Sequence, residues 1–197
     1  MLAQIGAVFG LIIALVYERL HWRIQNIHQL STELSVHIKT LIQQGENPLL
    51  EFKSSFRWDL EQNCTNRELE AVILKTIAGF LNSSTGGTLI IGVSDNGVII
   101  GLERDYLTLK RQDQDSFEQA IITAISTKSG ADLCQFVKVL FHVVENKHVC
   151  RLIIHASPHP VFLKQGKLLK FYLRTGGGTR DLNIKEAVDF IIHRWHR

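Results

Sequence analysis

Residues 46–53, ENPLLEFK, and residues 86–95, GGTLIIGVSD, decide the fold that this sequence predicts. In the first stretch, Pro48 keeps the residue before it out of helical conformation. Apolar and charged side chains then alternate, as they do in a half-buried strand. The second stretch holds an apolar run that is typical of a buried strand, and an Asp-Asn-Gly turn follows it. The two stretches therefore predict two strands of one domain.

Three carboxylates stand at the ends of these stretches: Glu46, Glu51 and Asp95. If both ends fold onto one edge of a sheet, the three side chains meet around a single divalent cation. Mg²⁺ and Mn²⁺ prefer oxygen ligands, whereas three clustered carboxylates without a cation repel one another. Lys53 shares a strand face with Glu51, so it orients that carboxylate or contacts a phosphate. Considered separately, each acid also fits an ordinary exposed surface charge.

The remaining pattern predicts an α+β domain over residues 46–197, with a mixed sheet and flanking helices. Period-2 and continuous apolar runs indicate strands, and residues with helical spacing indicate helices. A capping box at 65–68 begins the first helix of the domain. The expected strands are 49–55, 88–93, 98–101, 136–144, 148–155, 161–163 and 170–174, and the expected helices are 65–81, 113–126 and 184–193. The segment 56–64 is expected to be a loop.

Residues 1–17, MLAQIGAVFGLIIALVY, contain no charged side chain. As a helix they span about 25 Å, the short end of what crosses a bilayer. We predict an uncleaved single-pass membrane anchor, with a cleaved signal peptide or a buried globular helix as the alternatives. Positive side chains at 19–23 follow the run directly. The positive-inside bias therefore places the domain on the cytoplasmic side of the inner (cytoplasmic) membrane.

Residues 18–45 predict a helical stem with a coiled-coil seam. Seven positions are spaced alternately four and three residues apart, and six of them are apolar: Leu20, Ile24, Ile27, Ser31, Leu34, Ile38 and Leu41. The seam covers about three heptads and favours a homodimer. The alternative is a single amphipathic helix that packs on its own domain or lies on the membrane surface. Gly45 ends the helix in either case.

The charge distribution favours an anionic partner near the C-terminus. The whole chain of 197 residues carries only +3. From Lys164 onward, however, eight Lys and Arg stand against three Asp and Glu, which gives a local charge of +5 and favours phosphate. Arg174 and Arg180 flank a triple-glycine loop and are candidates for phosphate contacts. Their alternative role is pairing with Asp181 or Glu186.

Other cofactor and redox signatures do not occur in the sequence. The three cysteines are widely spaced and form no CxxC pair, which excludes a disulfide framework and a zinc knuckle and fits a reducing compartment. No GxxxxGK[ST] motif occurs, so ATP is not an expected ligand.

Four motifs together resemble the Schlafen-type AlbA domain over about residues 45–195. They are ExxxxEFK at 46–53, AGFLN at 78–82, GGTLIIGVSDNG at 86–97, and FYLR-x4-TR at 171–180. The resemblance implies catalytic acids at Glu46, Glu51 and Asp95, because the related domain of animal Schlafen proteins is an endoribonuclease that cuts transfer and ribosomal RNA. Bacterial members are described as DNA-binding or ATP-binding. This chain departs from the family in having Asn47 where Ser is usual, and in a longer segment 56–64.

Three functional hypotheses follow. The first is a membrane-tethered nucleic-acid-binding protein that prefers RNA to DNA and contacts it through Lys53, Arg174 and Arg180. The second is an endoribonuclease that depends on Mg²⁺ or Mn²⁺ held by Glu46, Glu51 and Asp95. The animal enzymes use two related lobes and this chain has one, so activity would require a homodimer. The third is a non-catalytic homo-oligomeric scaffold.

Overall fold

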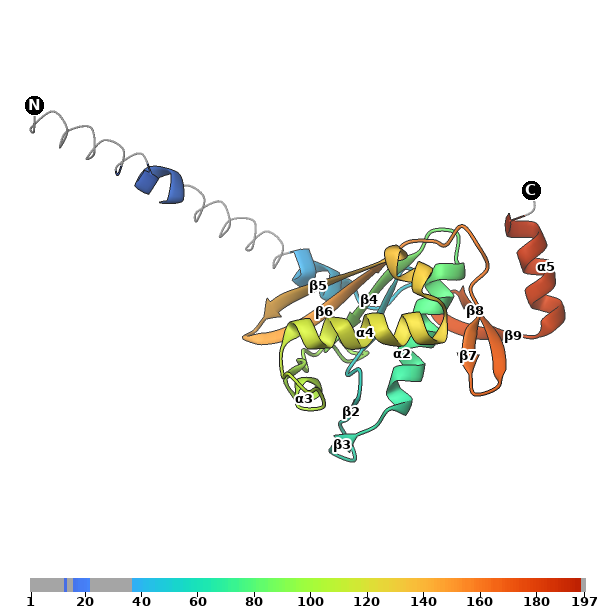
Figure 1. Ribbon diagram of the computed structural model, residues 1–197, viewed down its shortest axis with the longest axis horizontal. Coiled ribbons are helices and arrows are strands. Elements are labelled where there is room, and N and C mark those ends of the chain that lie inside the picture. Colours follow the sequence, from blue (N-terminus) through green and yellow to red (C-terminus); the bar gives the residue numbers. More distant parts are fainter. Residues whose placement is uncertain (1–12, 14–15, 22–36, 196–197) are drawn as a thin grey trace, which may run out of the picture. The chain divides into compact units, whose positions relative to one another are not determined.

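The computed structural model describes residues 13, 16–21 and 37–195 (Figure 1). The chain divides into two compact units, Met1–Thr40 and Leu41–Arg197. Most of the predicted membrane anchor at 1–17 and of the predicted stem at 18–45 lies outside the described residues, so both stay predictions. Within the part that is described, no helix has the length and apolar character needed to cross a membrane.

A mixed four-stranded sheet forms the centre of the second unit, as the sequence predicts. Its order is β1 (Leu50–Lys53), β4 (Gly87–Ile91), β6 (Lys147–Ile154), β5 (Val137–Val144). Strands β1 and β4 are parallel because helix α2 (Glu68–Asn82) connects them as a crossover; the other neighbouring pairs are antiparallel. The two stretches that predict the fold are therefore neighbours in the sheet, with Glu51 opposite Leu89.

Helices α2 and α4 (Gln114–Lys128) contribute to one hydrophobic core together with the sheet (Figure 1). The buried side chains include Ile77, Phe80 and Leu81 of α2, Phe117, Ile121 and Ile125 of α4, and Leu89, Ile91 and Leu152 of the sheet. Helix α4 begins where predicted, because the Asp113 carboxylate accepts a hydrogen bond from the amide of Ser116 at 2.9 Å. The predicted capping box at 65–68 is wrong, since the N-cap residue is Arg67, whose side chain makes no capping bond; the side-chain oxygen of Asn66 accepts from the amide of Glu68 at 2.9 Å instead.

A second, antiparallel sheet packs on α2. It consists of β7 (Leu163–Gln165), β8 (Leu168–Thr175) and β9 (Gly178–Leu182), and α5 (Ile184–Trp195) follows it. Buried Asn82 at the end of α2 donates to the carbonyl oxygens of Val161 and Tyr172, each at 2.8 Å. The sequence does not predict β9, α3 (Glu103–Tyr106), the 3-10 helix Ala131–Phe136, or the small ribbon of β2 (Trp58–Asp59) and β3 (Cys64–Thr65) inside the expected loop.

Candidate functional site

Glu51 lies at the centre of a buried ionic network. One carboxylate oxygen of Glu51 accepts a hydrogen bond from Nζ of Lys53 and the other from Nη1 of Arg174, both at 2.6 Å. Arg174 also donates to the carbonyl oxygens of Asn47 at 3.0 Å and Pro48 at 3.2 Å. The side chain of Arg174 is only 3% exposed. This network ties the start of β1 to the end of β8.

Glu46 and Asn47 shape the bend that precedes β1. The Glu46 carboxylate accepts a hydrogen bond from the amide of Phe52 at 2.7 Å. The side-chain oxygen of Asn47 accepts from the amide of Leu49 at 2.9 Å, which is an Asx turn. Asn47, a departure from the family pattern, therefore holds the bend through its own side chain.

Asp95 lies on the exposed turn after β4, where the amide of Gly97 donates to the carbonyl of Ser94 at 2.8 Å. No group of three or more His, Cys, Asp or Glu side chains in the described part of the chain is placed to hold one metal ion. As arranged here, the acids do not fit a metal, because both oxygens of Glu51 are bound by cations. The predicted gathering of Glu46, Glu51 and Asp95 around one ion stays a prediction.

Lys53 and Asp95 do share a cavity of about 370 Å³, here called the Lys53 cavity. Trp58, Asp59 and Glu61 contribute to its lining. Amides of the following turn donate to the Asp59 carboxylate, that of Gln62 at 2.9 Å, and lower the pKa of this group. One lysine thus faces three carboxylates, so the cavity alone does not attract a phosphate.

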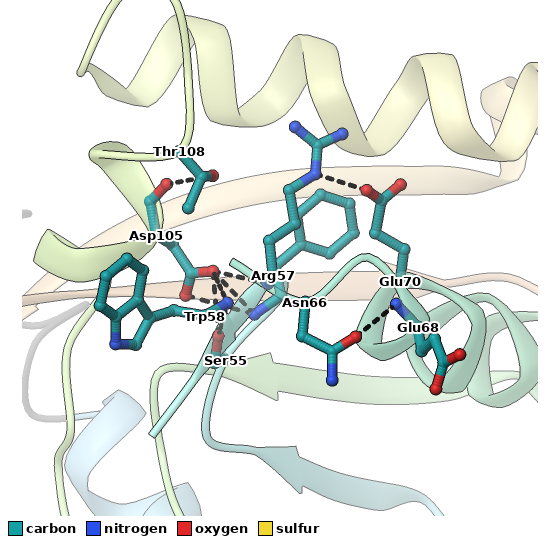
Figure 2. Close-up of polar contacts among 9 residues, drawn as sticks. Ser55, Arg57, Trp58, Asn66, Glu68, Glu70, Asp105 and Thr108 are labelled. Carbon is teal, nitrogen blue, oxygen red and sulfur yellow. Dashed lines mark hydrogen bonds and ion pairs between the residues drawn. The ribbon is translucent and has the colours of Figure 1, made fainter. Parts of the chain in front are cut away.

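Asp105 anchors the segment that forms one wall of the Lys53 cavity (Figure 2). One oxygen of its carboxylate accepts from the Ser55 hydroxyl at 3.0 Å and from the amides of Arg57 at 2.7 Å and Trp58 at 3.1 Å; both oxygens accept from the amide of Phe56 at 3.2 Å. Asp105 is 2% exposed. Burial raises the pKa of this carboxyl, and the backbone donors act in the opposite direction.

The Asp105 anchor directs two neighbouring side chains to different places. Figure 2 shows the Trp58 ring and the Arg57 guanidinium pointing away from each other. Trp58 lines the Lys53 cavity, whereas Arg57 reaches α2 and forms an ion pair of 2.7 Å with Glu70. Sequence reasoning missed Asp105 because it lies in a charged connection with no motif around it.

Arg57 belongs to a hollow of about 590 Å³ between α2, α4 and the β7–β8 turn, here called the basic groove. Its lining includes the cations of Arg57, Arg67, Lys128 and Lys164, and one carboxylate, Glu70. Among the described residues, the exposed side chains of Arg67, Lys128 and Lys164 form no ion pair. Sequence reasoning missed the groove because its cations come from four distant segments.

Arg180 and Arg174 both have protein partners. Arg180 is 63% exposed and pairs with Glu186 at 3.0 Å, one of the two alternatives that the sequence leaves open. Arg174 pairs with Glu51 instead of Asp181 or Glu186. A phosphate contact of Arg174 would require exchange of its buried bonds, and the predicted nucleic-acid contacts of Lys53, Arg174 and Arg180 stay predictions.

The sequence matches the family model described as Schlafen, AlbA_2 over residues 46–183. This chain therefore belongs to the Schlafen AlbA_2 family, which confirms the family that its four motifs predict. No curated protein matches the chain.

One solved structure shares the fold at low sequence identity, and a second is similar to a lesser extent. The crystal structure of the DIP2311 protein from Corynebacterium diphtheriae is 22% identical with a TM-score of 0.51, and the match covers 73% of this chain but only 23% of that one. The N-terminal domain of a RecG-related protein from Nitrosomonas europaea is 13% identical with a TM-score of 0.45, covering 74% of this chain and 92% of that domain.

Proposed function

We propose that this protein binds nucleic acid through the basic groove, with RNA preferred to DNA. The observation that carries the proposal is the composition of the groove: four cations from separate segments converge on one hollow that holds a single carboxylate. Since the only carboxylate, Glu70, is already paired with Arg57, the remaining three cations give the groove a positive potential that attracts phosphate oxygens.

The groove also offers hydrogen-bond donors and a fixed geometry. Thr123 and Thr127 of α4 and Gln165 of the β7–β8 turn lie in its lining, and such side chains commonly contact phosphate and sugar oxygens. Arg57 is held from both ends, since its backbone amide is bound by Asp105 and its guanidinium pairs with Glu70. A preorganised arginine loses less conformational entropy when it binds a ligand.

The preference for RNA, the membrane tether and the homodimer belong to the same proposal. The RNA preference is supported by the resemblance to the animal Schlafen domain that cuts RNA. The uncharged run at 1–17 supports a tether to the inner membrane, and the heptad spacing at 18–45 supports a parallel pair of stems. Two grooves on one dimer would bind a longer RNA with higher avidity than a single groove.

The test is a salt titration of RNA and DNA binding by the full-length protein and by a Lys128→Gln/Lys164→Gln variant. Each lost phosphate contact lowers the steepness of the plot of log K against log salt by about 0.7 to 0.9. The double variant should therefore lose about 1.5 from that slope and bind RNA at least about tenfold more weakly at low salt.

The matched control is Lys110→Gln/Lys138→Gln, which removes the same charge from exposed positions that are not in the lining of the groove. It should bind RNA almost as well as the unchanged protein. Equal losses in the two double variants would show a nonspecific charge effect and contradict a site in the groove. No binding by the unchanged protein at low salt would refute nucleic-acid binding altogether.

A further inference from the structure

A separate cavity of about 530 Å³ lies between the turn that follows α2, the end of β8 and α5, and is here called the α5 cavity. Its volume is in the range that holds small ligands. No Asp or Glu side chain is part of its lining, whereas His193 and Arg194 are. The α5 cavity therefore differs from the acidic Lys53 cavity in the charge it accepts.

The turn at 83–86 supplies hydrogen-bond donors to this cavity. Ser83 fixes the turn, since its hydroxyl donates to the carbonyl of Phe80 at 2.8 Å and accepts from the amide of Gly86 at 2.9 Å. In the described part of the chain, the amides of Ser84 and Thr85 and the hydroxyl of Ser84 have no hydrogen-bond partner. Adjacent donors of this kind suit the oxygens of an anion.

Helix α5 contributes His193 and Arg194. Nδ1 of His193 lies 2.7 Å from the carbonyl oxygen of Asp189; because a carbonyl oxygen only accepts, Nδ1 carries the hydrogen and Nε2 is left for a ligand. Arg194 lies over the ring of Trp195 and donates to the carbonyl of Ser157 at 3.4 Å. Its Nε atom is buried without a hydrogen-bond partner among the described residues. A buried donor without an acceptor is costly, so a movement of this side chain toward an acceptor on a ligand would relieve that cost.

An aromatic side chain completes the lining. Phe190 is half-buried and lines the cavity, with the rings of Phe171 and Trp195 at 6.1 and 6.0 Å. These neighbours hold the Phe190 ring in place. Aromatic rings stack on nucleobases regardless of their sequence.

We infer that the α5 cavity binds a nucleoside monophosphate, with the phosphate among Ser84, Thr85 and Arg194 and the base against Phe190. The sequence has no P-loop, and this cavity recognises one phosphate through a turn and a helix instead. The ligand is either a free nucleotide or the phosphorylated end of a strand. In the second case the inference rests on the proposed function and adds an end-recognising site to it.

The first test measures binding of adenosine 5′-monophosphate, adenosine and inorganic phosphate to the full-length protein by titration calorimetry. The monophosphate should bind at least about tenfold more tightly than either fragment, since it alone makes the charged and the stacking contacts. Arg194→Gln and Ser84→Glu should each weaken binding of the monophosphate about tenfold or more. The matched control is Lys185→Gln, which removes one charge from the same helix outside the cavity.

The second test separates the two sources of the ligand. A short RNA with a 5′-phosphate and the same RNA with a 5′-hydroxyl are titrated into the unchanged protein and into the Lys128→Gln/Lys164→Gln variant. Tighter binding of the phosphorylated RNA, lost in Arg194→Gln, assigns the site to strand ends; binding of the free monophosphate alone assigns it to nucleotides.

Two results would overturn the inference: adenosine binding as tightly as its monophosphate, or Arg194→Gln binding the monophosphate like the unchanged protein. If RNA binding fails while the monophosphate still binds through Arg194, the proposed function is refuted and the α5 cavity stands.

Discussion

Replacing Asp105 tests how the candidate site is held together. In Asp105→Ala, the Ser55 hydroxyl and the amides of Phe56, Arg57 and Trp58 lose their acceptor. The Trp58 amide keeps a second acceptor, the Ser55 hydroxyl oxygen at 2.7 Å, and Arg57 is only partly buried. Ser55 is also only partly buried, so one full penalty for an unpaired buried donor, that of Phe56, and two partial ones remain, which lowers the free energy of unfolding by about 3 kcal/mol.

Asp105→Asn is a milder change at the same position and should lower stability less than Asp105→Ala. A single oxygen of the Asp105 carboxylate receives four of its five hydrogen bonds, and an asparagine retains one such oxygen. We expect a loss of about 1 kcal/mol, because an amide group replaces the second carboxylate oxygen, which accepts from the amide of Phe56. Urea unfolding of the full-length protein, followed by tryptophan fluorescence, measures both variants. An alanine variant within about 0.5 kcal/mol of the unchanged protein would refute the anchoring role.

The difference in stability between the unchanged protein and Asp105→Asn should depend on pH, and the sign of this dependence can be worked out. Burial raises the pKa of Asp105 above its ordinary value of 3.8, so the folded protein holds the proton to a higher pH than the unfolded chain. The stability that this group contributes is complete below 3.8 and is lost as the pH rises through the folded pKa. The free energy of unfolding of Asp105→Asn should therefore come closer to that of the unchanged protein as the pH rises from that value. A deficit that grows with pH would contradict burial as the dominant cause.

Three further changes probe the fold and the predicted acids. Asn82→Ala should lower stability by about 3 kcal/mol in urea unfolding, since the buried amide group bridges two segments; an effect below about 1 kcal/mol would contradict this. Arg174→Met should lower the free energy of unfolding by about 3 kcal/mol, because it leaves the buried Glu51 carboxylate with the cation of Lys53 alone. Adding Glu51→Gln should restore part of the loss; a further loss would show that the two residues act separately. Asp95→Asn should fold normally and, if the triad is catalytic, abolish Mn²⁺-dependent RNA cleavage; identical products from both proteins would remove Asp95 from the mechanism.

The sequence predicts the parts of the fold that depend on local pattern. The strands around 50–53 and 87–91 and the helices at 68–82 and 114–128 have clear apolar periodicity, and the structure confirms them. The strand β9, GTRDL, was missed because its apolar and polar residues do not alternate, and because its pairing with β8 depends on tertiary contacts. Gly176 and Gly177, which the sequence analysis assigns to a loop, form the turn between β8 and β9.

The candidate site was harder to predict for a different reason. A short motif displays residues that are close in sequence, such as Glu46 and Glu51, whereas the basic groove joins positions from Arg57 to Lys164. Convergence of this kind depends on the packing of α2 against α4 and β7, which no single segment encodes. The pairing of Arg174 with Glu51 was missed for the same reason, since 123 residues separate the two along the chain.

Glu51 limits how a nuclease mechanism can work in this chain. Its two oxygens are bound at 2.6 Å by Lys53 and Arg174, so a metal ion would have to displace one of these cations. Arg174 also donates to the carbonyl oxygens of Asn47 and Pro48, whereas Lys53 donates to one carbonyl oxygen, that of Phe52 at 2.6 Å. Lys53 borders open space, because it lines the same cavity as Asp95. Glu51 would therefore hold a metal ion only in an arrangement of Lys53 that differs from the one observed.

The segment 55–58 links the Lys53 cavity to the basic groove. Arg57 lies in the basic groove and Trp58 in the Lys53 cavity, and the Asp105 anchor fixes one relative to the other. A nucleic-acid strand that bound Arg57 would therefore act on a segment that also walls the Lys53 cavity. Loosening this segment by Asp105→Ala should weaken RNA binding even though Asp105 is buried away from any ligand. Unchanged RNA affinity in a destabilised Asp105→Ala protein would show that the groove and the Lys53 cavity are independent.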